Sequence, residues 1–135
     1  MKQTFEEFIE LINKSTDRDP WVRDTNIEGY CYNIEIEAKE LIEAMKTKDY
    51  EHVKEELGDV LMDWAHACKL AEEQGLFTIK DVFNAVNEKI KRRKPYVLDS
   101  EKKEITKEEA VRIWKEVKKK EKEQKSQSQK SQTLK

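Results

Sequence analysis

The sequence predicts an all-α protein. Only three glycines and two prolines interrupt its 135 residues, and no alternating apolar and polar run flanks a hairpin turn. Apolar residues recur instead at spacings of three and four, which places them on one face of a helix. Because the connections between helices are short, we expect an antiparallel helical bundle with a single modest core.

The first two predicted helices each begin at a capping-box pattern, in which Ser or Thr precedes Glu by three residues. Thr4 with Glu7 begins the first helix, which should end before the sequence DRDPW. Pro20 indicates a loop. Thr25 with Glu28 begins the second helix.

A tight connection at residues 47–49, with the sequence TKD, should follow the second helix, which ends at about Lys46. The third helix is expected to run from about Tyr50 to Gln74. Gly75 favours a helix end there, because glycine readily adopts the left-handed conformation. Helices two and three should therefore be antiparallel neighbours.

Two more helices complete the prediction. Thr78 with Asp81 opens the fourth, which Pro95 closes, and Thr106 with Glu109 opens the fifth. Their apolar faces are formed by Ile79, Val82, Phe83, Val86 and Ile90, and by Ala110, Ile113, Trp114 and Val117.

Composition predicts one domain over residues 1–117 and a disordered tail over residues 118–135, which are rich in Lys, Gln and Ser. Cys31 and Cys68 show no metal-ligand spacing and no signal peptide is recognisable, so we expect reduced thiols and a cytoplasmic protein. No apolar run approaches the roughly 20 residues that span a bilayer.

The second and third helices both carry acids beside an apolar stripe. At about 100° per residue, Glu37 and Glu40 fall beyond one edge of the first stripe, and Glu56, Asp59 and Asp63 beyond the corresponding edge of the second. The stripes are Ile34, Ala38, Leu41, Ile42 and Met45, and Val53, Leu57, Val60, Leu61, Trp64, Ala67, Cys68 and Ala71.

Grouped acids repel one another, so a hard cation such as Mg²⁺, Mn²⁺ or Ca²⁺ would stabilise this seam. An ordinary solvated helix surface is an equally good interpretation of the spacing alone. The acid pattern therefore predicts a metal site without deciding for it.

Taken in order, these acids resemble a known family. Glu37-x-x-Glu40 precedes Glu56-x-x-Asp59, and the second of these two pairs lies within EELGDVL. The sequences GLF at 75–77 and NEKIKRRKPYV at 87–97 follow. Over residues 17–98 the chain resembles the MazG family of nucleoside triphosphate pyrophosphohydrolases. The resemblance implies the all-α fold of that family, assembled as a homodimer or homotetramer.

The resemblance also implies an activity: hydrolysis of a nucleoside triphosphate, modified or deoxy forms included, to the monophosphate and pyrophosphate. Mg²⁺, with Mn²⁺ as a substitute, would be held by Glu37, Glu40, Glu56 and Asp59. Glu40 and Glu56 would be catalytic, with Glu40 orienting or deprotonating the attacking water. Asp63 could hold a second metal or a water.

This sequence departs from the family at two positions. Ile36 stands where many members have a second Glu, and Asp19-Pro20-Trp21-Val22 replaces a common Cys-Pro-Trp-Asp stretch. The first change removes an acid that could lie around the metal. The second places Val22 where the family stretch ends in Asp, so any role of that acid has no counterpart in this chain.

Substrate contacts are predicted from the basic run KIKRRK at 89–94. Asn87, Lys91 and Arg92 are expected to contact phosphates, although basic residues at a helix C-terminus also suit its dipole. Trp21 is the expected partner of the nucleobase, because it lies beside a predicted loop.

Trp64 and His66 are predicted to have structural positions rather than roles in the site. Trp64 lies within an apolar stripe and is expected in the core. His66 lies three residues after Asp63, but His52 does not repeat the Glu-x-x-His pattern of di-iron bundles. We therefore expect His66 on a polar face.

Three other functions fit the sequence. The chain could act on phosphoribosyl-ATP, because those pyrophosphohydrolases share a similar acid pattern and fold. It could be a helical interaction protein with a basic tail, or a metal-binding bundle without hydrolysis. The tail lacks interleaved aromatic residues, so no specific nucleic acid partner is expected.

Overall fold

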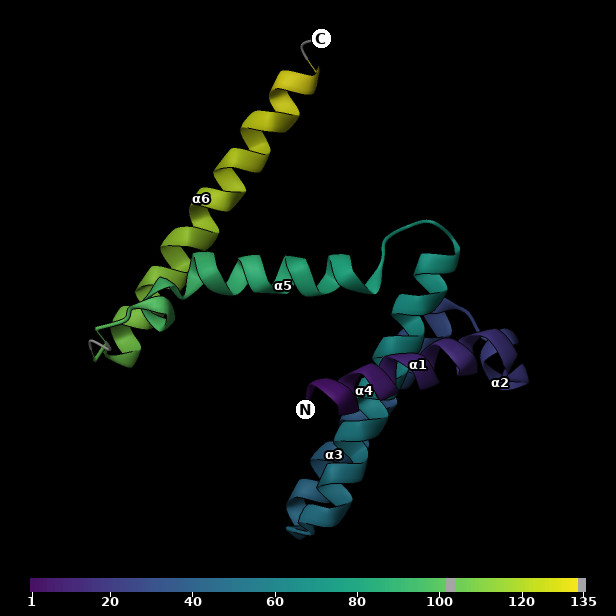
Figure 1. Cartoon of the computed structure of the whole chain (residues 1–135). Helices are drawn as coiled ribbons and strands as arrows, with labels where there is room; N and C mark the ends of the chain where they lie inside the picture. The colour runs from purple at the N-terminus through teal and green to yellow at the C-terminus, as the bar shows by residue number, and fades with distance from the viewer. Residues whose placement is uncertain (102–103, 134–135) are drawn as a thin grey trace. The chain divides into compact units, whose positions relative to one another are not determined.

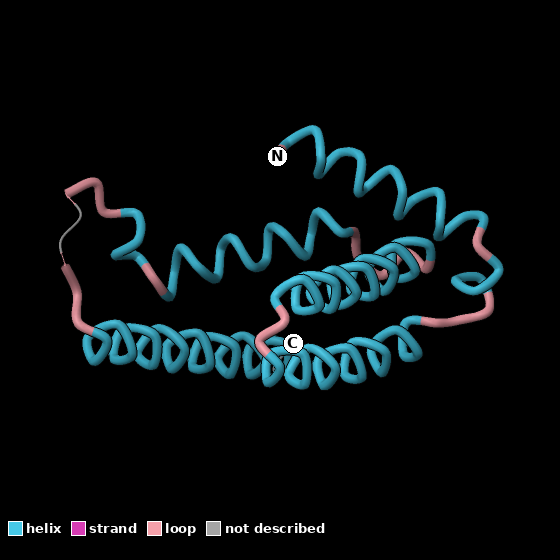
Figure 2. The backbone as a smooth tube through the Cα atoms, turned by 90° about the horizontal axis from the view of Figure 1, so that it is seen from below, coloured by secondary structure: helices cyan, strands magenta, loops and turns pink. Residues whose placement is uncertain are grey.

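The computed structural model describes residues 1–101 and 104–133, and it divides the chain into two compact units, Met1–Val82 and Phe83–Lys135. Figure 1 shows the helices of both units, and every regular element in the described residues is helical (Figure 2). The predicted all-α class is confirmed. No helix within the described residues is long and apolar enough to cross a membrane.

The helices follow the predicted order, with one short helix and one 3₁₀ helix added. In chain order they are α1 (Lys2–Arg18), α2 (Pro20–Arg23), α3 (Ile27–Thr47), α4 (Tyr50–Glu73), α5 (Ile79–Arg93), the 3₁₀ helix η1 (Pro95–Leu98) and α6 (Lys107–Thr133).

The first helix and the loop after it differ from the prediction. α1 begins at Lys2 without a side-chain cap, so Thr4 lies inside the helix. Pro20 is the first residue of α2 rather than part of a loop, because its fixed φ suits the first helical position. Asp19 caps α2 by accepting a hydrogen bond from Trp21 N at 3.0 Å.

The cap of α3 is shifted by one residue from the prediction. Asn26 Oδ1 accepts from Gly29 N at 2.8 Å, whereas the Thr25 hydroxyl donates back to Trp21 O at 2.8 Å. A Cβ at Gly29 would lie 2.8 Å from Thr25 Cγ2. Any larger residue at position 29 would therefore force the Thr25 side chain to move.

The boundaries between α3 and α4 and between α4 and α5 follow the prediction. Lys48, in the left-handed conformation with φ 58°, ends α3, and Asp49 caps α4. Gly75 has φ 69°, just after α4. Thr78 and Asp81 bond reciprocally at the start of α5, with Asp81 Oδ2 accepting from Thr78 N at 2.8 Å.

The first unit is built on the antiparallel pair α3 and α4, against which α1 packs (Figure 1). Its core cluster is Val22, Tyr30 and Leu70, with Ile27 and Ala67 packed around it. The core therefore gathers near one end of the α3–α4 pair, beside α2.

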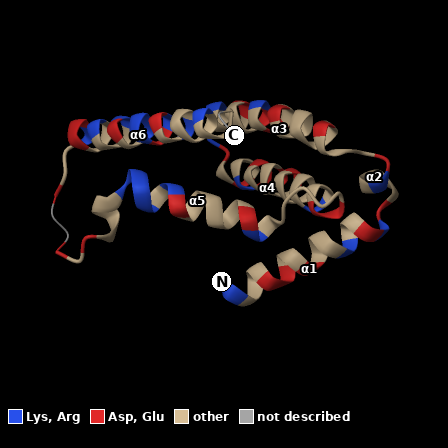
Figure 3. Cartoon of the chain, turned by 90° about the horizontal axis from the view of Figure 1, so that it is seen from above, with Lys and Arg blue, Asp and Glu red and all other residues tan. Residues whose placement is uncertain are grey.

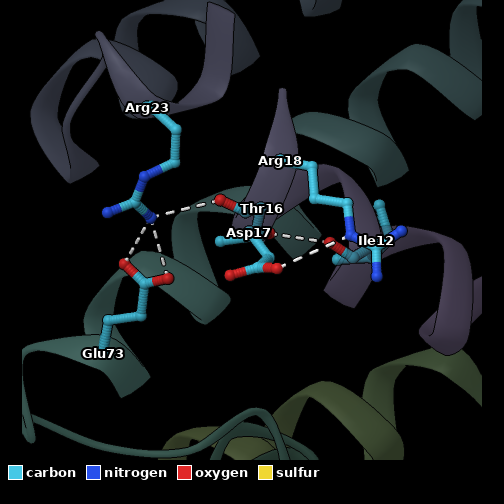
Figure 4. Close-up of polar contacts among 6 residues, drawn as sticks. All are labelled: Ile12, Thr16, Asp17, Arg18, Arg23 and Glu73. Atoms are coloured by element: carbon cyan, nitrogen blue, oxygen red, sulfur yellow. Dashed lines mark hydrogen bonds and ion pairs between the residues drawn. The ribbon is translucent and has the colours of Figure 1, made fainter. Parts of the chain in front are cut away.

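Arg23 connects three helices at this end of the unit. Its Nη1 atom donates to both carboxylate oxygens of Glu73 at 2.9 Å and to Thr16 O at 3.1 Å (Figure 4). One guanidinium thus links α2 to α1 and to the C-terminal end of α4.

The faces that α3 and α4 bury differ from the predicted stripes. Leu57 and Leu61 remain 53% and 47% exposed, whereas Glu56 and Asp63 are only 8% and 7% exposed. On α3, Ile42 and Met45 are also exposed. On α4 the predicted stripe is covered at Val53, Cys68 and Ala71 and exposed at Leu57 and Leu61, while Glu56 and Asp63 beside it are buried.

In the second unit, α5 and α6 are joined by charge pairs. Arg92 Nε and Arg93 Nη2 each donate to one oxygen of Glu121 at 2.8 Å, and Arg93 lies over the Trp114 ring at 4.8 Å. These hydrogen bonds, first from Arg93 and then from Arg92, lower the pKa of Glu121 to about 2. The predicted α6 face is the partly buried one.

Helix α6 continues through residues 118–133, where composition predicts a disordered tail. Basic and acidic side chains are both present in the first part of α6 (Figure 3), the last acid being Glu123, and no Gly or Pro interrupts the helix. Every side chain from Lys122 to Thr133 is exposed. The domain boundary at residue 117 stays a prediction.

Candidate metal centre

Acids from α3 and α4 converge at the middle of their contact. Within the described residues, Glu37, Glu56 and Asp59 form a group in which one carboxylate oxygen of each lies within 4.8 Å of the others. Glu37 comes from α3, and the other two lie one turn apart on α4. The antiparallel pairing thus brings together three of the four predicted ligands.

Two oxygens in this group lack a partner. Glu37 Oε2 and Glu56 Oε2 are both buried and accept no hydrogen bond. A buried carboxylate oxygen without a donor is costly, because the charge has lost its water. A cation among the three acids would supply what these oxygens lack.

The electrostatics of Glu37 agree with this interpretation. Burial raises the pKa of Glu37 to about 7, with added contributions from Glu40, Glu56 and Asp59. Near neutral pH a large fraction of the group is therefore protonated when no cation is present. Hard carboxylate oxygens at this spacing fit Mg²⁺, Mn²⁺ or Ca²⁺.

Glu40 and Asp63 lie outside the three-acid group but close to it. Glu40 is exposed, and after burial it is the main cause that raises the pKa of Glu37. Asp63 is buried one turn beyond Asp59, and burial, followed by the Asp59 charge, raises its pKa. The roles predicted for Glu40 and Asp63 stay predictions.

His52, which is not among the predicted site residues, contacts this group. His52 Nε2 donates to Glu56 Oε1 at 2.8 Å. His52 precedes Glu56 by four residues, which is the spacing of facing side chains on a helix. That spacing is visible in the sequence and predicts the contact once α4 is recognised as a helix.

The expectation that His66 lies on a polar face is wrong. His66 is 5% exposed, its Nε2 is hydrogen-bonded to Ser15 Oγ at 2.8 Å, and its ring lies 5.2 Å from that of Tyr30. Burial lowers its pKa. The packing of α1 and α3 against α4 covers this part of the helix.

The predicted substrate residues are distributed over both units. Asn87, Lys91 and Arg92 lie on the part of α5 that belongs to the second unit, and all three are exposed. Lys91 Nζ donates to Glu88 at 2.9 Å, and Arg92 is paired with Glu121. Trp21, on α2 of the first unit, is 75% exposed.

Comparison with known proteins places this arrangement in a family. Residues 26–98 match the MazG nucleotide pyrophosphohydrolase domain. A crystal structure of a mazG-related protein from Thermotoga maritima superposes with a TM-score of 0.77 and 32% identity, over 84% of this chain and 98% of that one.

Curated relatives agree. The nucleoside triphosphate pyrophosphohydrolase/pyrophosphatase MazG of Thermotoga maritima is 40% identical over 95 residues, 69% of this chain. The nucleoside triphosphate pyrophosphohydrolase of Escherichia coli K12 is 30% identical over 100 residues, 73% of this chain. This chain spans only 37% of the length of either relative. The matched domain contains all four predicted ligand acids, and the chain belongs to the MazG family.

Proposed function

We propose that this chain hydrolyses nucleoside triphosphates to the monophosphate and pyrophosphate, with a divalent cation bound by Glu37, Glu40, Glu56 and Asp59. Mg²⁺ is the proposed ion, and Mn²⁺ would substitute for it. The observation that carries the proposal is the convergence of acids from α3 and α4 around two buried, unpartnered oxygens. Membership of the family and the names of the relatives support the same reaction.

The chemistry follows from these side chains. When bound, Mg²⁺ would neutralise charge on the phosphate oxygens and lower the pKa of a water. Glu40 is the exposed member of the set, and we assign to it the acceptance of the proton from the attacking water. Glu56 and Glu37 would bind the cation that neutralises the phosphate charge. Attack forms a bond from water oxygen to the α-phosphorus and breaks the bond to pyrophosphate.

The product analysis tests this function directly. The purified chain is given a panel of canonical, deoxy and modified triphosphates and phosphoribosyl-ATP with Mg²⁺, and monophosphate and pyrophosphate are quantified separately. We expect both products in equal amounts from at least one nucleoside triphosphate. Orthophosphate and a nucleoside diphosphate as products would contradict attack at the α-phosphorus. Turnover of phosphoribosyl-ATP alone would favour that alternative.

The panel also separates the two alternatives without catalysis. A metal-binding bundle would be stabilised by Mg²⁺ but would turn over none of the nucleotides. A helical interaction protein would show neither effect. Deleting residues 122–135, which keeps Glu121 and its contacts with Arg92 and Arg93, should leave hydrolysis intact.

We further propose that Asn87, Lys91 and Arg92 contact the phosphates and that Trp21 stacks on the base. The support is their exposure and the positive charge of this stretch. Arg92 is held by Glu121, so it would exchange a carboxylate for a phosphate when substrate binds.

Lys91→Ala should raise the Michaelis constant severalfold with little change in kcat, because an exposed cation contributes about 1 kcal/mol to binding a polyanion. Lys80→Ala, an exposed lysine in the first turn of the same helix, is the matched control and should change neither constant. An unchanged Michaelis constant for Lys91→Ala would remove this residue from the site.

The chain is proposed to assemble as a homodimer or homotetramer in the cytoplasm. The support is the apolar surface left exposed on α3 and α4 by Ile36, Ile42, Met45 and Met62, and by Leu57 and Leu61. Leu57 and Leu61 lie one turn apart on α4 and form the assembly face. Both are residues that the periodicity predicts to be core. A second copy would remove this apolar surface from water, at about 25 cal/mol for each Å² buried.

A further inference from the structure

His52 is an exposed histidine in the first turn of α4 that contacts the acid group through one atom. Its side chain is 48% exposed, whereas the side chain of Glu56 is 10% exposed. The imidazole Nε2 lies 2.8 Å from Glu56 Oε1. An ionised carboxylate only accepts, so this nitrogen is the donor.

The two oxygens of Glu56 have different surroundings. Oε1 is occupied by His52, whereas Oε2 is buried and has no partner. Glu56 also belongs to the group whose ligand atoms lie within 4.8 Å of one another. The histidine therefore occupies one oxygen and leaves the other, which is buried, without a partner.

We infer that His52 is a positioning residue for the Glu56 carboxylate, which it holds with Oε2 free for the divalent cation. The inference rests on the proposed metal site. A glutamate has three rotatable side-chain bonds, and repulsion from Glu37 and Asp59 favours rotating the carboxylate out of the seam. A fixed donor on Oε1 opposes that rotation without occupying Oε2.

A purely local role would have a different signature. An i, i+4 pair on a helix adds a few tenths of a kcal/mol to stability and nothing to metal affinity. Donors that hold a metal-ligating side chain typically change affinity 10- to 100-fold when removed. Metal affinity measured without substrate therefore distinguishes positioning from helix stabilisation.

Four variants of the full chain isolate the hydrogen bond. His52→Leu removes the donor and keeps the bulk. His52→Gln retains an N–H at a similar distance from the backbone, and His52→Asn is too short to reach Glu56. Lys54→Leu is the matched control, because Lys54 pairs with Glu51 in the same turn of α4, outside the acid group.

Mn²⁺ binding is measured by the loss of the free-ion electron paramagnetic resonance signal, without nucleotide, with Mg²⁺ competition as confirmation. We expect His52→Leu and His52→Asn to weaken binding about 10- to 100-fold. His52→Gln should stay within about threefold of the wild type, since its amide replaces the donor. Lys54→Leu should bind as the wild type does.

Glu56→Gln separates the two possible failures. If Glu56→Gln loses Mn²⁺ and His52→Leu binds like the wild type, the role of His52 is refuted and the metal site stands. If the wild type does not bind Mn²⁺, or Glu56→Gln binds it unchanged, the proposed site itself is refuted. Should His52→Leu fail to fold, the Gln and Asn variants decide, and equal affinities for them would overturn the inference.

Discussion

Glu56→Gln is expected to fold and to lose hydrolysis by at least about 100-fold. The change replaces one buried oxygen of the acid group by an NH₂ group and removes a negative charge, while keeping the shape of the side chain. Stabilisation of the phosphate charge by a metal is worth several kcal/mol, and each 1.4 kcal/mol is a factor of about 10 in rate.

Stability gives the second half of the test. Without divalent cations Glu56→Gln should be at least as stable as the wild type, because it removes a charge that repels Glu37 and Asp59. Mg²⁺ should raise the melting temperature of the wild type and leave that of the variant unchanged. Pyrophosphate release and thermal unfolding, each with and without Mg²⁺, measure both effects.

The neighbouring residue provides the control. Glu55→Gln makes the same chemical change at an exposed position outside the acid group, so rate and Mg²⁺ response should match the wild type. Asp59→Asn should reproduce the loss seen for Glu56→Gln. If Glu56→Gln or Asp59→Asn folds and hydrolyses nucleotides at the wild-type rate, the ligand assignment is wrong.

Leu61→Glu is expected to dissociate the assembly into monomers. Leu61 is 47% exposed on the assembly face, although its spacing places it in a core stripe. If a second copy covers it, the new carboxylate must either lose its water or separate the copies. The cost of burying an unpaired charge exceeds the gain from burying a leucine.

Light scattering coupled to gel filtration measures the mass directly. The wild type should give two or four times the chain mass of 16.1 kDa, and Leu61→Glu should give 16.1 kDa. Leu61→Met keeps the apolar surface and volume and should retain the wild-type mass. A Leu61→Glu protein with the wild-type mass would show that the interface lies elsewhere, and a monomeric wild type would refute the assembly.

The sequence predicted the helices well because their signals are local. The ends at Lys48 and Gly75 and the reciprocal bonds of Thr78 with Asp81 depend on residues within one turn. Two errors were local as well. Thr25 bonds back to the preceding turn, which leaves Asn26 as the cap, and the proline at position 20 starts a helix.

The predicted ligand positions could also be read from the chain, since a helix fixes the angle between residues three and four apart. That angle relates residues within one helix only. Whether Glu37 meets Glu56 and Asp59 depends on the register between α3 and α4, which periodicity does not contain. The exposure of Glu40 and the covering of Asp63 follow from the same packing.

By itself, the sequence determined that this protein is helical, where α3, α4 and α5 lie, and which acids repeat at the spacing of its family. Only the tertiary structure decided which face of each helix is covered. It buried Glu56 and His66 and left Leu57 and Leu61 exposed. The physical reason is that amphipathic periodicity specifies a stripe, whereas burial depends on which neighbour packs against it.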